Sequence, residues 1–428
     1  TLIHRKILSV LRELTAIALI YGWFLTVYET GRYPGADGPH ILGTATRLAQ
    51  LIQDGEWSLF ILCFSSLLGP HPPFAYLPFT VAEFFSPNSS MTHLIGSSLV
   101  LWLCWDGIRR LSGGIFGLFF FLCCAPVWLQ AETAGIDLVA SATVIQSLSY
   151  LATSKELYRR RSTFLWGAWM GAAFMTKYTA PMFLWAPCLL AGWWVVKWSR
   201  WDRLILGIVG FAVVALPWWS THWKNVYGYV LASGDGSSGL LTNKALILGP
   251  WYAWENISWY PAAVADAVGW AALAFLIPAL ILSSKSFSIR GTLVLGMLGG
   301  WLFLNAQKQR QDRYLIAGSS LAAAAVGGSW LAWPLLPYFF QQGKETYRIY
   351  SDKKPAPAQR EYGHQISTAG DTWPIPANSY WPIDQNPDSW GIDQALRKVR
   401  SLHGSDHGTV GFLLEEEGGA PGYGIVLQ

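Results

Sequence analysis

Long apolar stretches that carry almost no charge recur along the chain up to about residue 340. A stretch of roughly 20 mostly apolar residues is long enough to cross a bilayer as a helix. In lipid, such stretches satisfy their backbone hydrogen bonds only within helices or closed barrels. The sequence therefore predicts an all-α polytopic membrane protein. About ten spans of this length are predicted, at residues 7–28, 91–108, 114–130, 136–153, 163–177, 180–197, 203–220, 261–283, 289–305 and 314–333.

The composition agrees with this class. Apolar residues make up 52% of the 428 residues and charged residues only 13%, against roughly 25% charged residues in an ordinary soluble domain. Many of the 25 Trp residues stand at the ends of apolar runs, at the depth where amphipathic rings meet lipid headgroups. The small net charge of +4 gives no reason to expect nucleic acid as a partner.

Short basic loops alternate along the chain with longer, more acidic ones. The basic loops include residues 109–110, 159–161 and 197–203. Cytoplasmic loops of membrane proteins carry an excess of Lys and Arg. We therefore expect the N-terminus in the cytoplasm of a plasma or inner membrane, and the loops at 29–90 and 221–260 on the outer side.

The first outer loop, residues 29–90, is not simply polar. Residues 40–53 place apolar groups at helical spacing, and residues 57–68 and 73–85 are short, apolar and aromatic. These segments are too short to span comfortably, so we predict helices that lie in the membrane interface.

The last ninety or so residues change character. Residues 1–340 form the predicted transmembrane domain, whereas 341–428 are polar and rich in Pro, Gly and Asp. An amphipathic helix pattern begins at Ser389, and residues 409–414 resemble a strand. We predict a small soluble α/β domain here. It lies in the cytoplasm if the chain has ten spans and outside if it has eleven.

Several short motifs fall at the outer ends of the predicted spans. They are A-D-G-P-H at 36–40, H-P-P at 71–73, Glu132 with Asp137, G-x-x-x-G at 167–171 followed by T-K-Y at 176–178, L-P-W-W at 216–219 and D-R-Y-L at 312–315. In this order and on one membrane face, they resemble the GT-C fold glycosyltransferases that use polyprenyl-phosphate sugars. That group includes glycosyltransferase family 39. It contains protein O-mannosyltransferases and the lipid A aminoarabinose transferase. The resemblance covers roughly residues 7–333.

The resemblance implies a reaction and its partners. A sugar moves from a lipid-linked phosphate to an acceptor hydroxyl or amine, with inversion at the anomeric carbon, on the extracytoplasmic side of the cell envelope. The donor is a polyprenyl-phosphate sugar, and the acceptor is a protein, lipid or glycan. No certain cofactor is implied, although a divalent metal could bind the acidic residues. Membrane lipids and other membrane subunits are the further partners.

Three acidic residues are candidates for catalysis. The displacement needs a base within hydrogen-bond reach of the acceptor proton, and the resemblance points to Asp37. Many relatives carry Asp-Glu here, whereas Gly38 follows in this chain. Asp-Gly is also ordinary turn chemistry. Glu132 and Asp137 could orient the acceptor or a metal, but Glu132 could be solvated and Asp137 could be a helix N-cap.

Basic and aromatic residues are candidates for substrate binding. Lys177 lies in an apolar hairpin, where a lysine faces a polar cavity or snorkels to the surface. Lys308, Arg310 and Arg313 cluster near the outer end of two spans and suit phosphate, or anchor to headgroups instead. The remaining candidates for substrate contact are His71, Trp251 and Trp254. His71 could equally fix a turn, and the two Trp could belong to the interfacial belt.

Two other classes of protein remain open. A catalytically silent GT-C subunit of a membrane assembly fits the missing second acid after Asp37. A transporter or flippase would commonly show internal repeats and broken helices near the midplane. The sequence has no convincing repeat, and its ionisable residues gather at one face instead of in mid-span.

Overall fold

The computed structural model describes residues 2–30, 38–66, 72–87, 91–112, 114–132, 134–235, 286–306, 316–327, 410–412 and 425–427, with short pieces between 252 and 344. The described elements are helices apart from two short strands. The α-helices are α1 (Leu2–Thr30), α2 (Gly38–Gln53), α3 (Trp57–Ser66), α4 (Leu77–Glu83), α5 (Thr92–Ser112), α6 (Phe116–Leu122), α7 (Ala125–Glu132), α8 (Ile136–Thr153), α9 (Arg160–Phe174), α10 (Trp185–Trp198), α11 (Trp201–Asp235), α14 (Phe287–Ala306) and α15 (Ile316–Gly327). Two 3-10 turns are η1 (Pro73–Ala75) and η2 (Ala180–Phe183).

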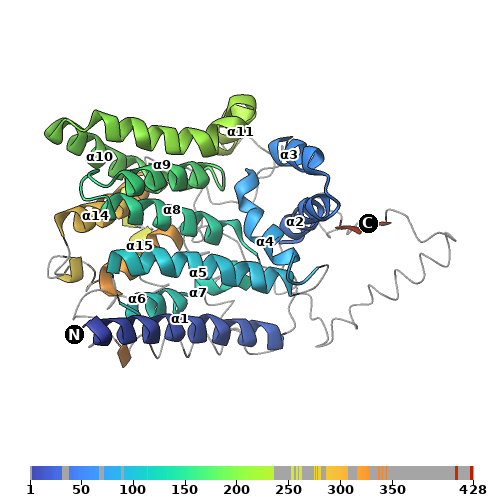
Figure 1. Cartoon of the computed structure of the whole chain (residues 1–428), viewed down its shortest axis with the longest axis horizontal. Helices are drawn as coiled ribbons and strands as arrows, with labels where there is room; N and C mark the ends of the chain where they lie inside the picture. The colour runs from blue at the N-terminus through green and yellow to red at the C-terminus, as the bar shows by residue number, and fades with distance from the viewer. Residues whose placement is uncertain are drawn as a thin grey trace.

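The long helices run side by side in one bundle, and α2, α3 and α4 gather at one end of it (Figure 1). Four helical segments are long and apolar enough to cross a membrane: Ile7–Tyr28, Ile136–Thr153, Trp201–Lys224 and Phe287–Asn305. In the second of these, 89% of the residues are buried inside the protein, against 17% in the first. The chain is therefore a multi-pass integral membrane protein, with α8 at the centre of the bundle and α1 at its edge.

Where the predicted spans are described, helices occupy them, with two differences. The predicted span at 114–130 is broken into α6 and α7, because Pro126 can start a helix but cannot continue one. The predicted span at 203–220 is too short, since α11 continues through Pro217 to Asp235. The predicted span at 261–283 lies mostly outside the described residues, and the count of about ten spans stays a prediction.

The described parts of the first outer loop are largely helical, as the apolar periodicity predicts. In α2, Ile41, Ala45 and Leu48 are almost fully buried and pack on the core. Helix α3 turns apolar side chains outward instead, and Ile61 and Leu62 are 63% and 60% exposed. Exposed apolar residues of this size suit contact with lipid. The placement of these helices in the interface stays a prediction.

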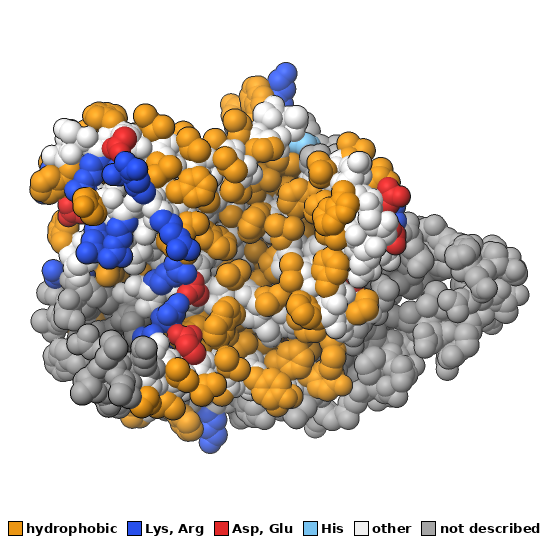
Figure 2. Space-filling model, in the orientation of Figure 1, with side chains coloured by type: hydrophobic (Ala, Val, Ile, Leu, Met, Phe, Trp, Pro, Cys, Tyr) orange, Lys and Arg blue, Asp and Glu red, His pale blue; other side chains and the backbone are white. Residues whose placement is uncertain are grey.

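Charge is segregated along the bundle. Figure 2 shows Lys and Arg side chains gathered at the end of the molecule where α1 begins, beside a broad apolar surface with few charges. The basic residues at this end belong to the helix ends and turns near 109–110, 154–161 and 197–203. The loops predicted to share one side of the membrane thus lie at one end of the bundle. The assignment of that end to the cytoplasm stays a prediction.

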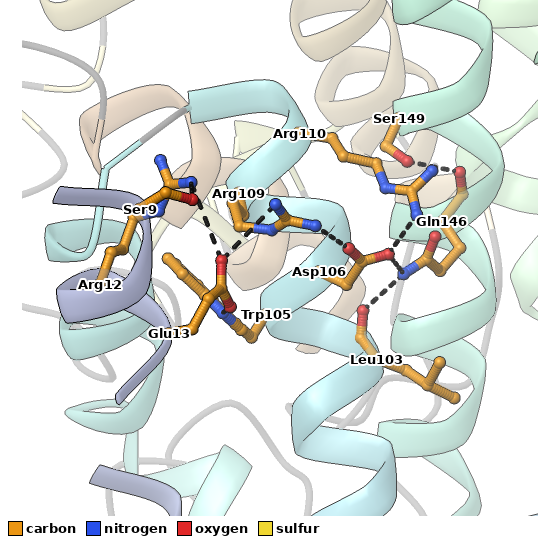
Figure 3. A network of polar contacts seen from close by, with 10 residues as sticks. All are labelled: Ser9, Arg12, Glu13, Leu103, Trp105, Asp106, Arg109, Arg110, Gln146 and Ser149. Carbon is orange, nitrogen blue, oxygen red and sulfur yellow. Dashed lines mark hydrogen bonds and ion pairs between the residues drawn. The ribbon is translucent and has the colours of Figure 1, made fainter. Parts of the chain in front are cut away.

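A polar network at the basic end joins α5 to α8 (Figure 3). The Asp106 carboxylate accepts hydrogen bonds from Arg109 and Arg110, both at 2.6 Å, and from the Gln146 amide at 3.0 Å. The Arg110 guanidinium also lies 4.2 Å from the centre of the Tyr150 ring. One carboxylate therefore pairs with two cations and, through Gln146, ties α5 to α8.

The same network extends to α1 through Glu13. Its carboxylate accepts a hydrogen bond from the Trp105 indole at 3.0 Å and lies 3.5 Å from Arg109. Arg12 lies 3.8 Å from the same carboxylate. The N-terminal helix, whose surface is otherwise largely exposed, is thus attached to the bundle by charge as well as by packing.

Helices α9 and α11 pack closely because glycines face each other. A Cβ atom on Gly167 would lie 1.8 Å from the Gly207 carbonyl oxygen, and one on Gly210 would lie 2.3 Å from the Phe164 carbonyl oxygen. Small residues let helix backbones approach closely in membranes. The G-x-x-x-G motif at 167–171 therefore has a packing role in this fold.

We expect Gly167→Val to destabilise the protein. The added side chain meets a backbone atom that cannot rotate away, so the helices must separate, at a cost of about 3 kcal/mol. The thermal unfolding midpoint of the purified protein in detergent measures this loss. Gly192→Val is the matched control, because a Cβ atom there has no neighbour within 4 Å. An equal drop in both variants would contradict the packing role.

The C-terminal region is described only at two strands. Strands β1 (Val410–Phe412) and β2 (Ile425–Leu427) pair antiparallel, with Val410 opposite Leu427. The predicted strand at 409–414 contains β1. The helix pattern that begins at Ser389 lies outside the described residues, and the α/β domain at 341–428 stays a prediction.

Candidate functional site

A buried ion pair joins α8 to the turn after α9 at the end of the bundle opposite the basic loops. Lys177 Nζ lies 2.6 Å from Asp137 Oδ1, and the two side chains are 12% and 5% exposed. The residues are 40 positions apart in the chain. Lys177 is thus neither at the lipid surface nor an isolated charge, because a carboxylate from another helix holds its ammonium group.

The end of α9 sets the position of Lys177. The helix stops at Phe174, and the Thr176 hydroxyl donates back to the Ala172 carbonyl oxygen at 2.7 Å. The Lys177 carbonyl oxygen then accepts from the amide of Ala180, the first residue of the η2 turn, at 3.1 Å. The predicted hairpin of two helices joined by a turn around Lys177 and Pro181 is therefore confirmed, and the lysine in that turn points inward.

The start of α8 sets the position of Asp137. The N-cap of this helix is Gly135, so the alternative that Asp137 caps the helix is wrong. A Cβ atom on Gly135 would lie 1.9 Å from Gln130 Oε1. The Gly135 amide donates to the Gln130 carbonyl oxygen at 2.6 Å. The preceding Ala134 has a left-handed backbone with φ 54°. Asp137 stands in the first turn, where the helix dipole favours a carboxylate.

Glu132 ends α7 a few residues before Asp137. Its side chain is only 1% exposed, so the alternative that it is simply solvated is wrong. The adjacent Ala131 carbonyl oxygen accepts from the Ser97 hydroxyl of α5 at 2.5 Å, which fixes the end of α7. Two buried carboxylates, Glu132 at the end of α7 and Asp137 in the first turn of α8, therefore flank the short link between these helices.

Three of the predicted motifs meet beside this ion pair. The amide of Phe74, which follows H-P-P, donates to the Met175 carbonyl oxygen at 2.8 Å, next to T-K-Y. Met175 and Trp218 share one buried cluster with Phe74, Tyr178 and Trp219 packed against it. The first outer loop, the Lys177 turn and the L-P-W-W segment of α11 are therefore neighbours in space.

Two buried polar residues in this region have no counterpart in the sequence prediction. His222 is 8% exposed, and its ring stacks on the Trp218 indole with the centroids 4.6 Å apart. His222 follows Trp218 at helical spacing, but the predicted span ended at residue 220, so the sequence did not place His222 on the same helix. Glu83 is 4% exposed and accepts from the Thr46 hydroxyl at 2.8 Å. Glu83 is an acidic residue within an apolar stretch of the outer loop, and this position could have predicted that it is buried.

The structure does not describe most of the other predicted site residues. Asp37, His71, Trp251, Lys308, Arg310 and Arg313 lie outside the described residues. Trp254 is described, and its indole is 74% exposed. Among the described residues, no group of three or more His, Cys, Asp or Glu is arranged to hold a metal ion.

Comparison with known proteins gives a structural likeness. No family profile and no curated protein sequence matches the chain. The crystal structure of ArnT from Cupriavidus metallidurans bound to undecaprenyl phosphate is similar, with a TM-score of 0.51 and 16% sequence identity over 80% of this chain and 63% of ArnT. The apo structure of the same ArnT is similar with a TM-score of 0.51 and 15% identity, over 79% of this chain and 62% of ArnT.

This likeness concerns the fold. The chain is an all-helical membrane protein with an ArnT-like arrangement of helices. It spans 63% of the length of ArnT. The expected resemblance to GT-C glycosyltransferases therefore agrees with the fold, and the activity is a matter for proposal.

Proposed function

We propose that the chain is a membrane glycosyltransferase that takes its sugar from a polyprenyl-phosphate donor. The observation that carries the proposal is the buried Lys177–Asp137 pair, placed where three motifs meet. The fold is similar to that of ArnT, an aminoarabinose transferase that has been crystallised with undecaprenyl phosphate. An intramembrane ionisable pair is costly and is usually functional.

Lys177 is the proposed contact for the donor phosphate. Breakage of the bond between the anomeric carbon and the phosphate oxygen leaves negative charge on polyprenyl phosphate. A fixed cation in a site of low dielectric stabilises that charge as it develops. Asp137 keeps the ammonium group in place before the donor arrives, and the pair remains close to neutral in the empty site.

A carboxylate on the same side would take the acceptor proton. We propose Asp37 as this base, since the resemblance points there, and Glu132 and Asp137 as groups that orient the acceptor or the lysine. The acceptor oxygen or nitrogen attacks the anomeric carbon from the face opposite the phosphate, so the configuration inverts. Lys308, Arg310 and Arg313 would add positive charge for the phosphate, while His71, Trp251 and Trp254 would contact the substrates.

Undecaprenyl phosphate is the probe for this proposal. We expect the purified chain in nanodiscs to bind it, and native mass spectrometry can count the bound lipid. A panel of polyprenyl-phosphate sugars should then yield free polyprenyl phosphate in the presence of extracts that contain acceptors. The same sugars on a water-soluble phosphate are the control and should not react. Binding without turnover would favour the silent subunit, and movement of intact donor across the bilayer would favour a flippase.

A further inference from the structure

The turn between α8 and α9, at the basic end of the bundle, has an unfavourable backbone. Lys155, Glu156 and Leu157 follow one another with φ values of 54°, 55° and 67°. Residues that carry a Cβ atom rarely adopt this left-handed conformation, and a run of them persists only where the surroundings enforce it. A simple connection between two helices does not require three consecutive left-handed residues.

Contacts from both sides hold this turn. On the inside, Leu157 is fully buried and its amide donates to the Ser154 hydroxyl at 2.9 Å. On the outside, the Arg200 guanidinium donates to the carbonyl oxygen of Lys155 at 3.2 Å and to that of Glu156. The Arg200 side chain, just before α11, therefore holds two carbonyl oxygens of the turn in this left-handed geometry.

Trp198 completes this attachment. Its indole donates to the Glu156 carboxylate at 2.6 Å. The neighbouring Ser199 is itself left-handed, with φ 51°, which closes α10 beside the turn. The Glu156 carboxylate of the turn is thus already hydrogen-bonded to Trp198.

The attachment leaves a row of exposed cations. The exposed ones are Lys155, Arg159, Arg160, Arg161 and Lys197. Within the described part of the chain, none of these five lies within 4.0 Å of a carboxylate, whereas Arg203 pairs with Asp202 at 3.4 Å. The surface therefore holds positive charge that no carboxylate of the described residues neutralises (Figure 2).

Aromatic rings place these cations at the membrane surface. Tyr158, Trp198 and Trp201 are 66%, 46% and 58% exposed. Lys197 Nζ lies 4.7 Å from the centre of the Trp198 ring. Exposed Trp and Tyr favour the headgroup level, and Val196 is likewise exposed on the adjoining apolar surface.

We propose that this surface binds the headgroup of an anionic phospholipid. We call it the basic turn, and it comprises residues 155–161 and 197–200. Guanidinium groups suit bidentate contact with phosphate, and the aromatic rings would lie against the upper acyl chains. The basic turn and Lys177 lie at opposite ends of α9, whose 15 residues span about 22 Å. The lipid site is therefore separate from the donor site and independent of the proposed glycosyltransferase activity.

Lipid titration of the full-length protein tests the charge. We expect native mass spectrometry to show tighter binding of phosphatidylglycerol than of phosphatidylcholine. The triple variant Arg159→Gln/Arg160→Gln/Arg161→Gln should bind phosphatidylglycerol roughly 100-fold more weakly, because each basic side chain near an anionic surface contributes about fivefold. Lys224→Gln, an exposed lysine at the other end of the bundle, should bind as the wild type does.

A charge-preserving pair of variants tests the shape. Arg200→Lys keeps the charge but loses the two-carbonyl contact, so the basic turn should relax and phosphatidylglycerol binding should weaken about fivefold. Arg203→Lys also keeps the charge. The Arg203 side chain pairs with Asp202 and not with the carbonyl oxygens of Lys155 and Glu156, so this variant should leave binding unchanged. Thermal midpoints without added lipid show whether each variant is folded.

Three results would overturn the proposal. One is equal affinity of the wild type for phosphatidylglycerol and phosphatidylcholine. Another is an equal loss in Arg200→Lys and Arg203→Lys, which would leave only diffuse attraction. The third is displacement of the lipid by inorganic phosphate at equal concentration, which would assign the surface to a soluble anion instead.

Discussion

Lys177→Ala is expected to lower kcat/KM for a polyprenyl-phosphate sugar by at least about 100-fold, the usual effect of removing one group that stabilises transition-state charge. The Lys177 side chain is 12% exposed, and its ammonium group is held 2.6 Å from Asp137. Water can replace it only poorly, so the phosphate that forms on bond breakage would lose its cation. Release of polyprenyl phosphate by the purified variant measures the loss.

A structural role for the pair must be separated from a role in the reaction. Lys177→Ala alone leaves the Asp137 carboxylate buried without this cation, which is itself destabilising. The double variant Lys177→Met/Asp137→Leu replaces the pair by apolar groups of similar size, so it should keep the thermal midpoint of the wild type while remaining inactive. Lys224→Ala, an exposed lysine of α11, should stay fully active. A folded and active double variant would show that the pair is only structural.

Asp106→Ala is expected to give the largest loss of stability, about 2–4 kcal/mol in the free energy of unfolding. The carboxylate receives two guanidinium groups and the Gln146 amide, and it is 20% exposed. Its removal takes away the carboxylate that pairs with Arg110 and leaves Arg109, among the described residues, with only the Glu13 carboxylate, 3.5 Å away. The contact between α5 and α8 would weaken, and the thermal midpoint in detergent would fall.

Asp202→Ala is the matched control for that loss. Asp202 is also an acidic residue at the basic end and pairs with Arg203 at 3.4 Å, but its side chain is 63% exposed. Exposed ion pairs contribute about 0–1 kcal/mol. A similar loss in the two variants would mean that burial and the number of partners do not matter here.

Much of the helical framework could be predicted from the sequence, because lipid leaves the backbone few choices. Helix α8 has the predicted bounds, and the hairpin around Lys177 and the outer-loop helices are present. The errors concern proline. Pro126 breaks a predicted span, whereas Pro217 lies inside α11 without ending it. Neighbouring helices decide which of these outcomes applies, since they can compensate for the lost hydrogen bond.

The candidate site was predictable as a set of residues but not as an arrangement. Lys177, Asp137 and Glu132 could be named because charges in apolar surroundings need a reason to be there. Their pairing could not, since a hydrogen bond across 40 positions leaves no local pattern. Glu83 and His222 escaped notice because an isolated polar residue in an apolar stretch has no periodicity of its own.

The sequence by itself determined that this chain crosses a membrane, where its helices run and which loops share a side, because hydropathy and charge act locally on each segment. Only the tertiary structure decided that Lys177 finds Asp137, that Arg200 holds the basic turn and that the glycines of α9 meet those of α11. These contacts depend on which helix faces cover one another. That choice follows from packing over the whole bundle, where close fit between helices takes the place of a hydrophobic driving force.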